Sequence, residues 1–335
     1  MHARPMTHPG FVRHHLRAIL GAGALVILTT AYAAWWLYAS GLLKSELSLL
    51  QERGPAVGIT AQWSAIALTG FPFAVAADLE KPVYANDQIG FGWTGETLRV
   101  SFRPWSLSPV RFVAPGQQRW IVAQGENTIT IDAHAKAAAA SYASAPERVT
   151  LDTEETRGTV QWAETSLPFT VARAKLSGSA WIDKDKQQSL AKAVALIEAD
   201  GLILQGLALP LGPKIDRLRL DAEIAPPGPQ TPATVKLASA QFAADGVEIK
   251  GAGTLTLDAQ GTPEGTLDLT VRGLPRLAEA LGQKGLLTAS AAMTVKMAAG
   301  LIATDQTEVS LPLRFTQGQM FLGPAPLGPA PRLVF

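Results

Sequence analysis

The chain contains no cysteine and almost no histidine outside its N-terminus. With no cysteine among 335 residues, disulfide bonds, iron–sulfur clusters, thiol nucleophiles and cysteine-ligated zinc sites are all excluded. Four of the five histidines lie within the first 15 residues, which leaves His134 alone in the remainder. A catalytic zinc site or a serine nucleophile therefore has a single histidine to draw on, and no G-x-S-x-G elbow is present. We expect a protein that is not an enzyme and that holds no metal or cofactor.

Charged residues are also scarce. They make up 17% of the chain, below the ~25% of an average globular protein. The apolar fraction of 47% nevertheless excludes a disordered chain. From residue 44 onward there are 28 acidic and 26 basic residues, without the basic cluster that binds nucleic acid. We expect no nucleic-acid partner.

One long uncharged run lies near the N-terminus. No charged side chain occurs between Arg17 and Lys44, a run of 26 residues, whereas about 20 suffice to cross a bilayer. Three aromatic residues, Trp35, Trp36 and Tyr38, lie 18 to 21 residues after Arg17, or about 27–32 Å along a helix. This spacing predicts a transmembrane helix over residues 18–43, with Arg17 at one membrane interface and the three aromatic residues at the other.

The charge pattern also predicts orientation and location. Because positive charges precede the span, residues 1–17 are expected in the cytoplasm and the main domain in the periplasm, anchored in the inner membrane. The helical pattern continues as far as residue 53, where Gly54-Pro55 stops it. An alternative is a cleaved signal peptide, for which Ala31-Tyr32-Ala33 offers a small-x-small cleavage site.

Short runs of alternating apolar and polar residues dominate residues 55–333. Leu98, Val100 and Phe102, for instance, alternate with polar side chains, and Gly, Pro, Asn or Asp separates most such runs. The alternation changes phase near Ser64, which predicts a bulge or a turn. We expect a mainly β exported domain of curved antiparallel sheets with one or two short helices.

Two segments have helical spacing. The apolar residues of 274–282 predict a short helix that ends at Gly282. Residues 186–199 fit a helix and a strand equally well. The exported domain is one unit or two lobes, with a boundary near residues 137–146, where alanines replace larger side chains, or near residues 226–232, which are rich in proline.

Two further motifs resemble ligand-binding sites but lack the necessary context. Gly90 to Gly95 matches G-x-G-x-x-G, yet a strand pattern follows it and no acidic residue stands about 20 positions later. Asp183 and Asp185 begin like a calcium loop, but Val194 occupies the twelfth position, where a bidentate acid is needed. We interpret the first as a β-turn or bulge and the second as a solvated turn.

Several glycine- and proline-rich stretches occur in a recognisable order. They are Gly70-Phe71-Pro72 followed by Pro104-Trp105, then Leu209-Pro210-Leu211-Gly212-Pro213, and then Leu311-Pro312-Leu313 leading to Gly323-Pro324-Ala325-Pro326. In this order residues 55–333 resemble the bacterial family called domain of unknown function 2125. The resemblance implies a single N-terminal membrane anchor and a β-rich envelope domain, and it carries no assigned activity or catalytic residue. A weaker, fold-level analogy is to the AsmA-like proteins, which are thought to hold lipids along an apolar sheet face.

The C-terminal stretch FLGPAPLGPAPRLVF is apolar, where a free tail would carry charge. Proline lacks a backbone donor and favours sheet edges. We therefore expect the tail to lie extended along a sheet edge or over an open end of the domain. The side chains expected to dock are Met320, Phe321, Leu327, Leu333 and Phe335.

These observations leave three hypotheses about function. The first is a non-catalytic, single-pass membrane protein of the envelope that binds an apolar ligand such as a lipid, or an envelope partner, along a β-sheet face. The second is a purely structural or interaction protein with a filled β core. The third and least favoured is a hydrolase with an unrecognised site. A continuous apolar sheet face left open would favour the first over the second.

Overall fold

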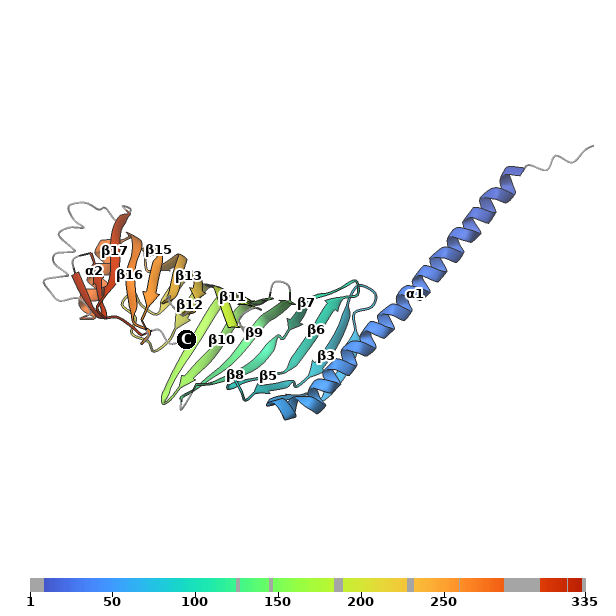
Figure 1. Cartoon of the computed structure of the whole chain (residues 1–335), viewed down its shortest axis with the longest axis horizontal. Helices are drawn as coiled ribbons and strands as arrows, with labels where there is room; N and C mark the ends of the chain where they lie inside the picture. The colour runs from blue at the N-terminus through green and yellow to red at the C-terminus, as the bar shows by residue number, and fades with distance from the viewer. Residues whose placement is uncertain are drawn as a thin grey trace, which may run out of the picture.

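A computed structural model describes residues 9–124, 127–144, 147–183, 189–227, 232–258, 260–285, 308–323 and 325–332. The fold is one large antiparallel sheet that is not closed, with a long helix at one end and a short helix at the other (Figure 1). This architecture confirms the predicted fold class. The helices are α1 (Pro9–Arg53), which is followed by a short 3-10 helix (Gly54–Val57), and α2 (Leu274–Gln283).

The sheet is a meander in which successive segments of the chain pair through hairpins. The first strands are β1 (Ile59–Gln62), β2 (Ala65–Thr69), β3 (Val75–Glu80), β4 (Val83–Asn86), β5 (Phe91–Gly95), β6 (Thr97–Arg103), β7 (Ser106–Val113) and β8 (Gly116–Gln124). The central strands are longer: β9 (Asn127–Ser144), β10 (Glu147–Trp162), β11 (Thr165–Asp183) and β12 (Ser189–Leu204). The last are β13 (Lys214–Ala225), β14 (Ala233–Ala244), β15 (Val247–Leu257), β16 (Pro263–Arg272), β17 (Val309–Thr316), β18 (Gln319–Leu322) and β19 (Ala325–Pro329).

The first eight strands are four long strands that are each broken once. Ile59 of β1 faces Asn86 of β4, and Ala65 of β2 faces Glu80 of β3, so one register runs across the break. The same holds where β3 and β4 pair with β6 and β5. Strands β7 and β8 then both pair with the single strand β9. The sheet therefore forks at β9 into two branches, β8-β5-β4-β1 and β7-β6-β3-β2.

A line of backbone irregularities, the break line, crosses the sheet at the level of these breaks. On alternate strands it contains a residue with a positive φ: Lys81 (48°), Gly116 (88°), Glu155 (45°) and Gly201 (62°). Irregularities of this kind bend a strand and increase its twist. Side chains from the two sides of the break line meet at one cavity, which is lined by Leu79 on one side and by Tyr84 on the other.

The outer surface of the break line is polar. Two successive residues are exposed where the line crosses β9, β10 and β11, and ion pairs join Lys136 to Glu155 (2.5 Å) and Arg173 to Glu154 (3.6 Å). Pairs as exposed as these are strongly screened by solvent. They therefore show which surface faces water, and they add little to the stability of the fold.

The opposite surface, which carries Leu79, Val100 and Leu151, is here called the inner face. Its apolar side chains form a core at the α1 end of the sheet, where Leu79 and Val100 are buried and Leu43 and Leu47 of the helix pack against them. Residue Ala39 of α1 is buried as well. The C-terminal third of the long helix is thus part of the folded domain.

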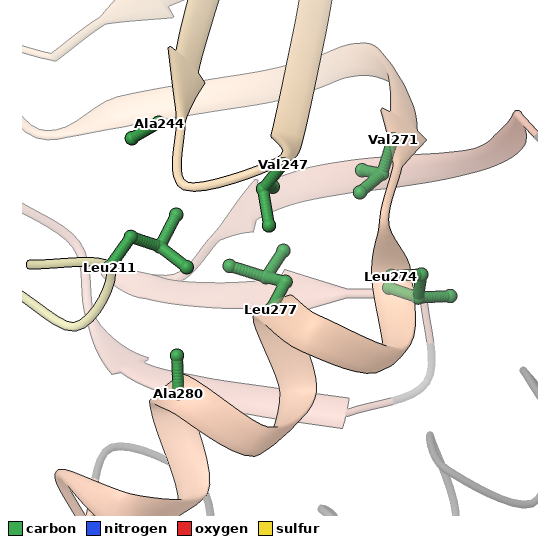
Figure 2. Packing of buried hydrophobic residues seen from close by; sticks show 7 residues of the cluster. All are labelled: Leu211, Ala244, Val247, Val271, Leu274, Leu277 and Ala280. Atoms are coloured by element: carbon green, nitrogen blue, oxygen red, sulfur yellow. The ribbon is translucent and has the colours of Figure 1, made fainter. Parts of the chain in front are cut away.

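A second core lies at the α2 end of the inner face. Figure 2 shows Leu277 of α2 pointing toward Val247 at the tip of the β14–β15 hairpin. The cluster consists of Leu211, Ala244, Val247, Val271, Leu274, Leu277 and Ala280. Leu274, Leu277 and Leu281 recur at helical spacing, so one stripe of the short helix is apolar and covers the sheet.

The structure decides the segments that the sequence pattern left open. Residues 189–199 belong to strand β12 rather than to a helix, while residues 184–188 lie outside the described part of the chain. The predicted helix near residue 274 is confirmed as α2. The sheet continues through both candidate lobe boundaries, since β9 pairs with β10 and β13 pairs with β14. The division of residues 55–333 into lobes stays a prediction.

Candidate functional site

An unbroken row of aliphatic and aromatic side chains and small residues crosses the inner face from β6 to β17. Each member faces the next across a strand pair, in the order Val100, Phe112, Ala140, Leu151, Leu176, Ile197, Leu220, Ala240, Gly251, Leu269 and Leu311. Because side chains on one strand alternate between faces, such a row can form only where each strand pairs with the next in a register that keeps these residues on one face. The row joins the core under α1 to the core under α2.

Parallel rows widen this surface into an apolar band. One further row, two residues along each strand, contains Ala174, Ala199, Leu218 and Phe242. Another, displaced in the opposite direction, contains Val149, Gly178, Ala195, Ala222 and Leu237, and Leu237 lies three residues from Ala240 because β14 has a bulge there. With strands about 4.8 Å apart and alternate residues about 6.7 Å apart, the first row is roughly 48 Å long, and the three rows together are roughly 13 Å wide over the strands that they share. These three rows are called the apolar band below.

The apolar band ends in a cavity next to α1. The cavity has a volume of about 380 Å³ and is lined by Leu47 and Leu50 of the helix and by side chains from both branches of the sheet. Among the polar residues at its wall is Gln118, which is buried. Its amide accepts a hydrogen bond from Trp93 Nε1 (3.3 Å) and donates one to the carbonyl of Ala114. The polar group is therefore held by the protein, and the space beside it suits an apolar chain.

The middle of the apolar band is open to solvent. Val149 retains 53% of its accessible surface, Leu176 45% and Ile197 37%. Val271, on the same face at the α2 end, retains 1%. Full burial of one such side chain is worth about 1.5–3 kcal/mol. The exposed middle therefore offers binding energy to an apolar ligand that the α2 end of the inner face no longer offers.

The outer face has the opposite character. Arg99 donates hydrogen bonds to both carboxylate oxygens of Asp78 (2.6 and 2.8 Å) and lowers the pKa of that carboxyl below its ordinary value. Arg219 lies 3.1 Å from Glu198 on neighbouring strands. The sheet thus has one charged, solvated face and one apolar face, a common arrangement in antiparallel sheets.

The predicted membrane-interface residues lie on α1. Trp35 and Tyr38 are exposed, Trp36 is half-buried, and Arg17 lies nearer the N-terminus of the helix. The sequence did not reveal that the two indoles hold turns of the sheet: Trp35 Nε1 donates to the carbonyl of Pro104 (3.0 Å) and Trp36 Nε1 to that of Ala74 (2.7 Å). The stretches Gly70-Phe71-Pro72 and Pro104-Trp105 were the available signal. Their place at a membrane interface stays a prediction.

The predicted tail-docking residues lie on the last two strands or beyond them. Met320 and Phe321 of β18 and Leu327 of β19 are half-buried. β19 is hydrogen-bonded to β18, and Met320 packs against the buried cluster of Leu255, Leu267 and Phe315. Leu333 and Phe335 lie outside the described residues. That this segment caps the sheet stays a prediction.

Beyond helix α1, the candidates for metal binding in the described part of the chain are His134 and the acidic residues. Among those residues no three His, Asp or Glu side chains lie close enough together to hold a metal ion. His134 is exposed on β9, in a shallow surface hollow that it shares with Lys136 and Glu155. The segment from Gly90 to Gly95 forms a hairpin turn and strand β5, which continues into β6. The chemistry that the site offers is apolar contact over a long surface.

Comparison with known proteins identifies a family for this sheet and its N-terminal helix. A family model described as "Uncharacterized protein conserved in bacteria (DUF2125)" matches residues 36–331. No curated protein matches the chain, and no solved structure matches it. The matched region begins within α1 and includes every strand of the sheet. The chain therefore belongs to the DUF2125 family, as its glycine- and proline-rich stretches predicted.

Proposed function

We propose that this protein is a non-catalytic, membrane-anchored envelope protein that binds a lipid by its acyl chains along the apolar band. The observation that carries the proposal is the exposure of Val149, Leu176 and Ile197 in the middle of an otherwise continuous apolar surface. A filled core would bury these side chains. The fold-level analogy to lipid-holding sheet proteins points in the same direction, but it identifies no lipid-binding residue in this chain.

The second part of the proposal concerns the membrane. Helix α1 is long and apolar enough to cross a bilayer. From Tyr32 onward it contacts the sheet, so the segment available to the bilayer precedes these contacts. Positive charges stand before that segment, which supports an N-terminus in the cytoplasm and a sheet in the periplasm.

Lipid binding is tested by counting the lipid molecules that co-purify with matched variants. The full chain is needed, because Leu43 and Leu47 of α1 pack into the domain core. Ile197 faces the apolar band, whereas its neighbour Leu196 faces the outer surface on the same strand. We expect Ile197→Glu to lose lipid several-fold relative to wild type when lipids are extracted and measured by mass spectrometry. Leu196→Glu should retain the wild-type amount.

The control also separates the competing functions. The amount of lipid that merely surrounds α1 should be the same in wild type and in both variants, so it does not affect the comparison. Equal lipid content in wild type, Ile197→Glu and Leu196→Glu would contradict binding on the band. Capture of one envelope protein by wild type but not by Ile197→Glu would assign the band to a protein partner instead.

Topology is tested by a reporter that is active only outside the cytoplasm. Fused after Phe335, it should be active, and the full-length protein should stay in the membrane fraction. A released chain that begins near Ala34 would instead indicate a cleaved signal peptide.

A further inference from the structure

We propose that two turns of the sheet, residues 70–74 and 103–107, sit in the periplasmic interface of the bilayer that holds α1. The inference rests on the proposed membrane anchoring and does not depend on lipid binding along the apolar band. Phe71, Phe73, Trp105 and Leu107 are its apolar tips, and we call this group the turn platform. Phe73 retains 77% of its accessible surface, and Trp105 retains 65%.

These exposed tips need an explanation because they gather in one place. Scattered apolar side chains on a surface are normal, but a cluster rimmed by polar residues marks a protein or membrane contact. The turn platform meets α1 directly: Trp36 lies edge-on to Phe71, with ring centroids 5.4 Å apart, and Tyr32 donates a hydrogen bond to the carbonyl of Pro72. Its neighbour is thus the same helix that is expected to enter the bilayer.

The level of the turns along α1 selects a bilayer as the occupant. The turns are fixed to Tyr32, Trp35 and Trp36 through the hydrogen bonds that these side chains donate. At 1.5 Å per residue, Trp35 lies about 27 Å along the helix from Arg17. The hydrocarbon core of a bilayer is about 30 Å thick. With Arg17 at the cytoplasmic interface, the turns therefore arrive at the opposite one, where exposed tryptophan and phenylalanine side chains are favourable.

Two basic side chains, together with the acidic Asp152, line a hollow beside the apolar tips. Arg103 and Arg111 are exposed and line the same hollow on the outer face as Phe73. Within the described residues neither arginine forms an ion pair. Long basic side chains next to apolar groups reach up to phosphate headgroups while their neighbours enter the acyl region. The turn platform should accordingly favour anionic phospholipids.

The absence of cysteine makes a direct depth measurement possible. A single cysteine at Phe73 or at Ile89 can carry an environment-sensitive NBD fluorophore without background labelling. Ile89 is the matched control, because it is 66% exposed and lies in the turn between β4 and β5. This turn is at the far end of the long strand that β3 and β4 form together. Both side chains are surface-exposed, so neither Phe73→Cys nor Ile89→Cys should prevent folding.

The full-length labelled proteins are reconstituted into phosphatidylcholine vesicles that contain phosphatidylglycerol. The label at Phe73→Cys should show blue-shifted emission and lose most of its intensity when lipids with a nitroxide near the headgroup are added. The label at Ile89→Cys should show water-like emission and no quenching. Replacing both arginines, Arg103→Gln with Arg111→Gln, should reduce the effect of phosphatidylglycerol on the Phe73→Cys label.

The outcomes separate this inference from the proposed function. A water-like, unquenched label at Phe73→Cys in a protein that stays in the vesicles would overturn the turn platform and leave the anchor intact. A blue-shifted label that nitroxide lipids do not quench would also overturn it, because it would indicate burial against protein. Extraction of the whole protein by alkaline carbonate would instead refute the anchor itself.

Discussion

The covered α2 end of the inner face and the open middle of the apolar band carry the same kinds of residue but differ in what covers them. At the α2 end Val247 and Val271 each retain 1% of their accessible surface beneath the short helix. In the middle Leu176 and Ile197 lie in the same face and retain far more. The difference comes from the covering element and not from the sheet. A single sheet thus provides a stable core at its ends and an open apolar surface between them.

The largest effect on this comparison is expected from deleting residues 319–335. The deletion removes β18 and β19, whose half-buried side chains Met320, Phe321, Leu322 and Leu327 are together worth roughly 3–6 kcal/mol if each contributes half of full burial. It also exposes the edge of β17. Since a domain is typically stable by only ~5–15 kcal/mol, we expect a lower melting temperature and oligomerisation through the new edge. An unchanged melting temperature would show that the tail stabilises nothing.

A second pair of variants compares the closed end with the open middle directly. Leu277→Ala in the α2 core should cost about 2–5 kcal/mol in the free energy of unfolding. Leu176→Ala, at a side chain that is already half-exposed, should cost under about 1 kcal/mol. Urea unfolding of both proteins measures the difference. Equal losses would mean that the middle of the band is covered and would remove the basis for ligand binding there.

Two strand glycines sharpen the comparison further. A Cβ at Gly158 would lie 2.3 Å from the carbonyl oxygen of Asp132, whereas a Cβ at Gly178 in the apolar band would come no closer than 4.0 Å to Val194. We expect Gly158→Ala to cost about 1–3 kcal/mol through overlap with backbone. Gly178→Ala should leave the melting temperature nearly unchanged. A strongly destabilised Gly178→Ala would indicate a closely packed layer over the band.

The smallest effect is expected on the outer face, where Arg99 lowers the pKa of Asp78 through its hydrogen bonds. A depressed carboxyl pKa stabilises the fold above the ordinary pKa, and this contribution is lost as the pH falls through the folded value. The stability difference between wild type and Asp78→Asn should therefore be present at neutral pH and shrink below about pH 4. Because the pair is exposed, the difference should stay under about 1 kcal/mol. A difference that grows toward low pH would contradict this assignment.

Much of the fold could be predicted from local pattern. Alternation such as Leu98, Val100 and Phe102 identifies β6, and the phase change near Ser64 coincides with the break between β1 and β2. Residues 189–199 were ambiguous because their small and aliphatic side chains fit both the helical and the strand periodicity. Pairing with β11 and β13 makes the segment a strand. The alternation within one strand cannot show that the breaks of several strands align in one line. That alignment depends on the register in which neighbouring strands pair.

The candidate site was less accessible to sequence reasoning for a related reason. Leu176 and Leu269 are both leucines in alternating strands, yet one is exposed and the other is half-buried near the C-terminal strands. Only the position of the covering element distinguishes them, and that position depends on contacts between distant segments. The link between Trp36 and the turn at Ala74 joins residues 38 positions apart and was equally invisible.

The most direct test of lipid binding on the open band is photo-crosslinking in growing cells. A photoreactive amino acid is placed at Leu176, which faces the band, or at Lys175, which faces the outer surface of the same strand. After irradiation, the full-length protein is purified and its covalent adducts are identified by mass spectrometry. The account predicts lipid adducts at position 176 and none at position 175. Lipid adducts in equal amounts at both positions, or at neither, would contradict it.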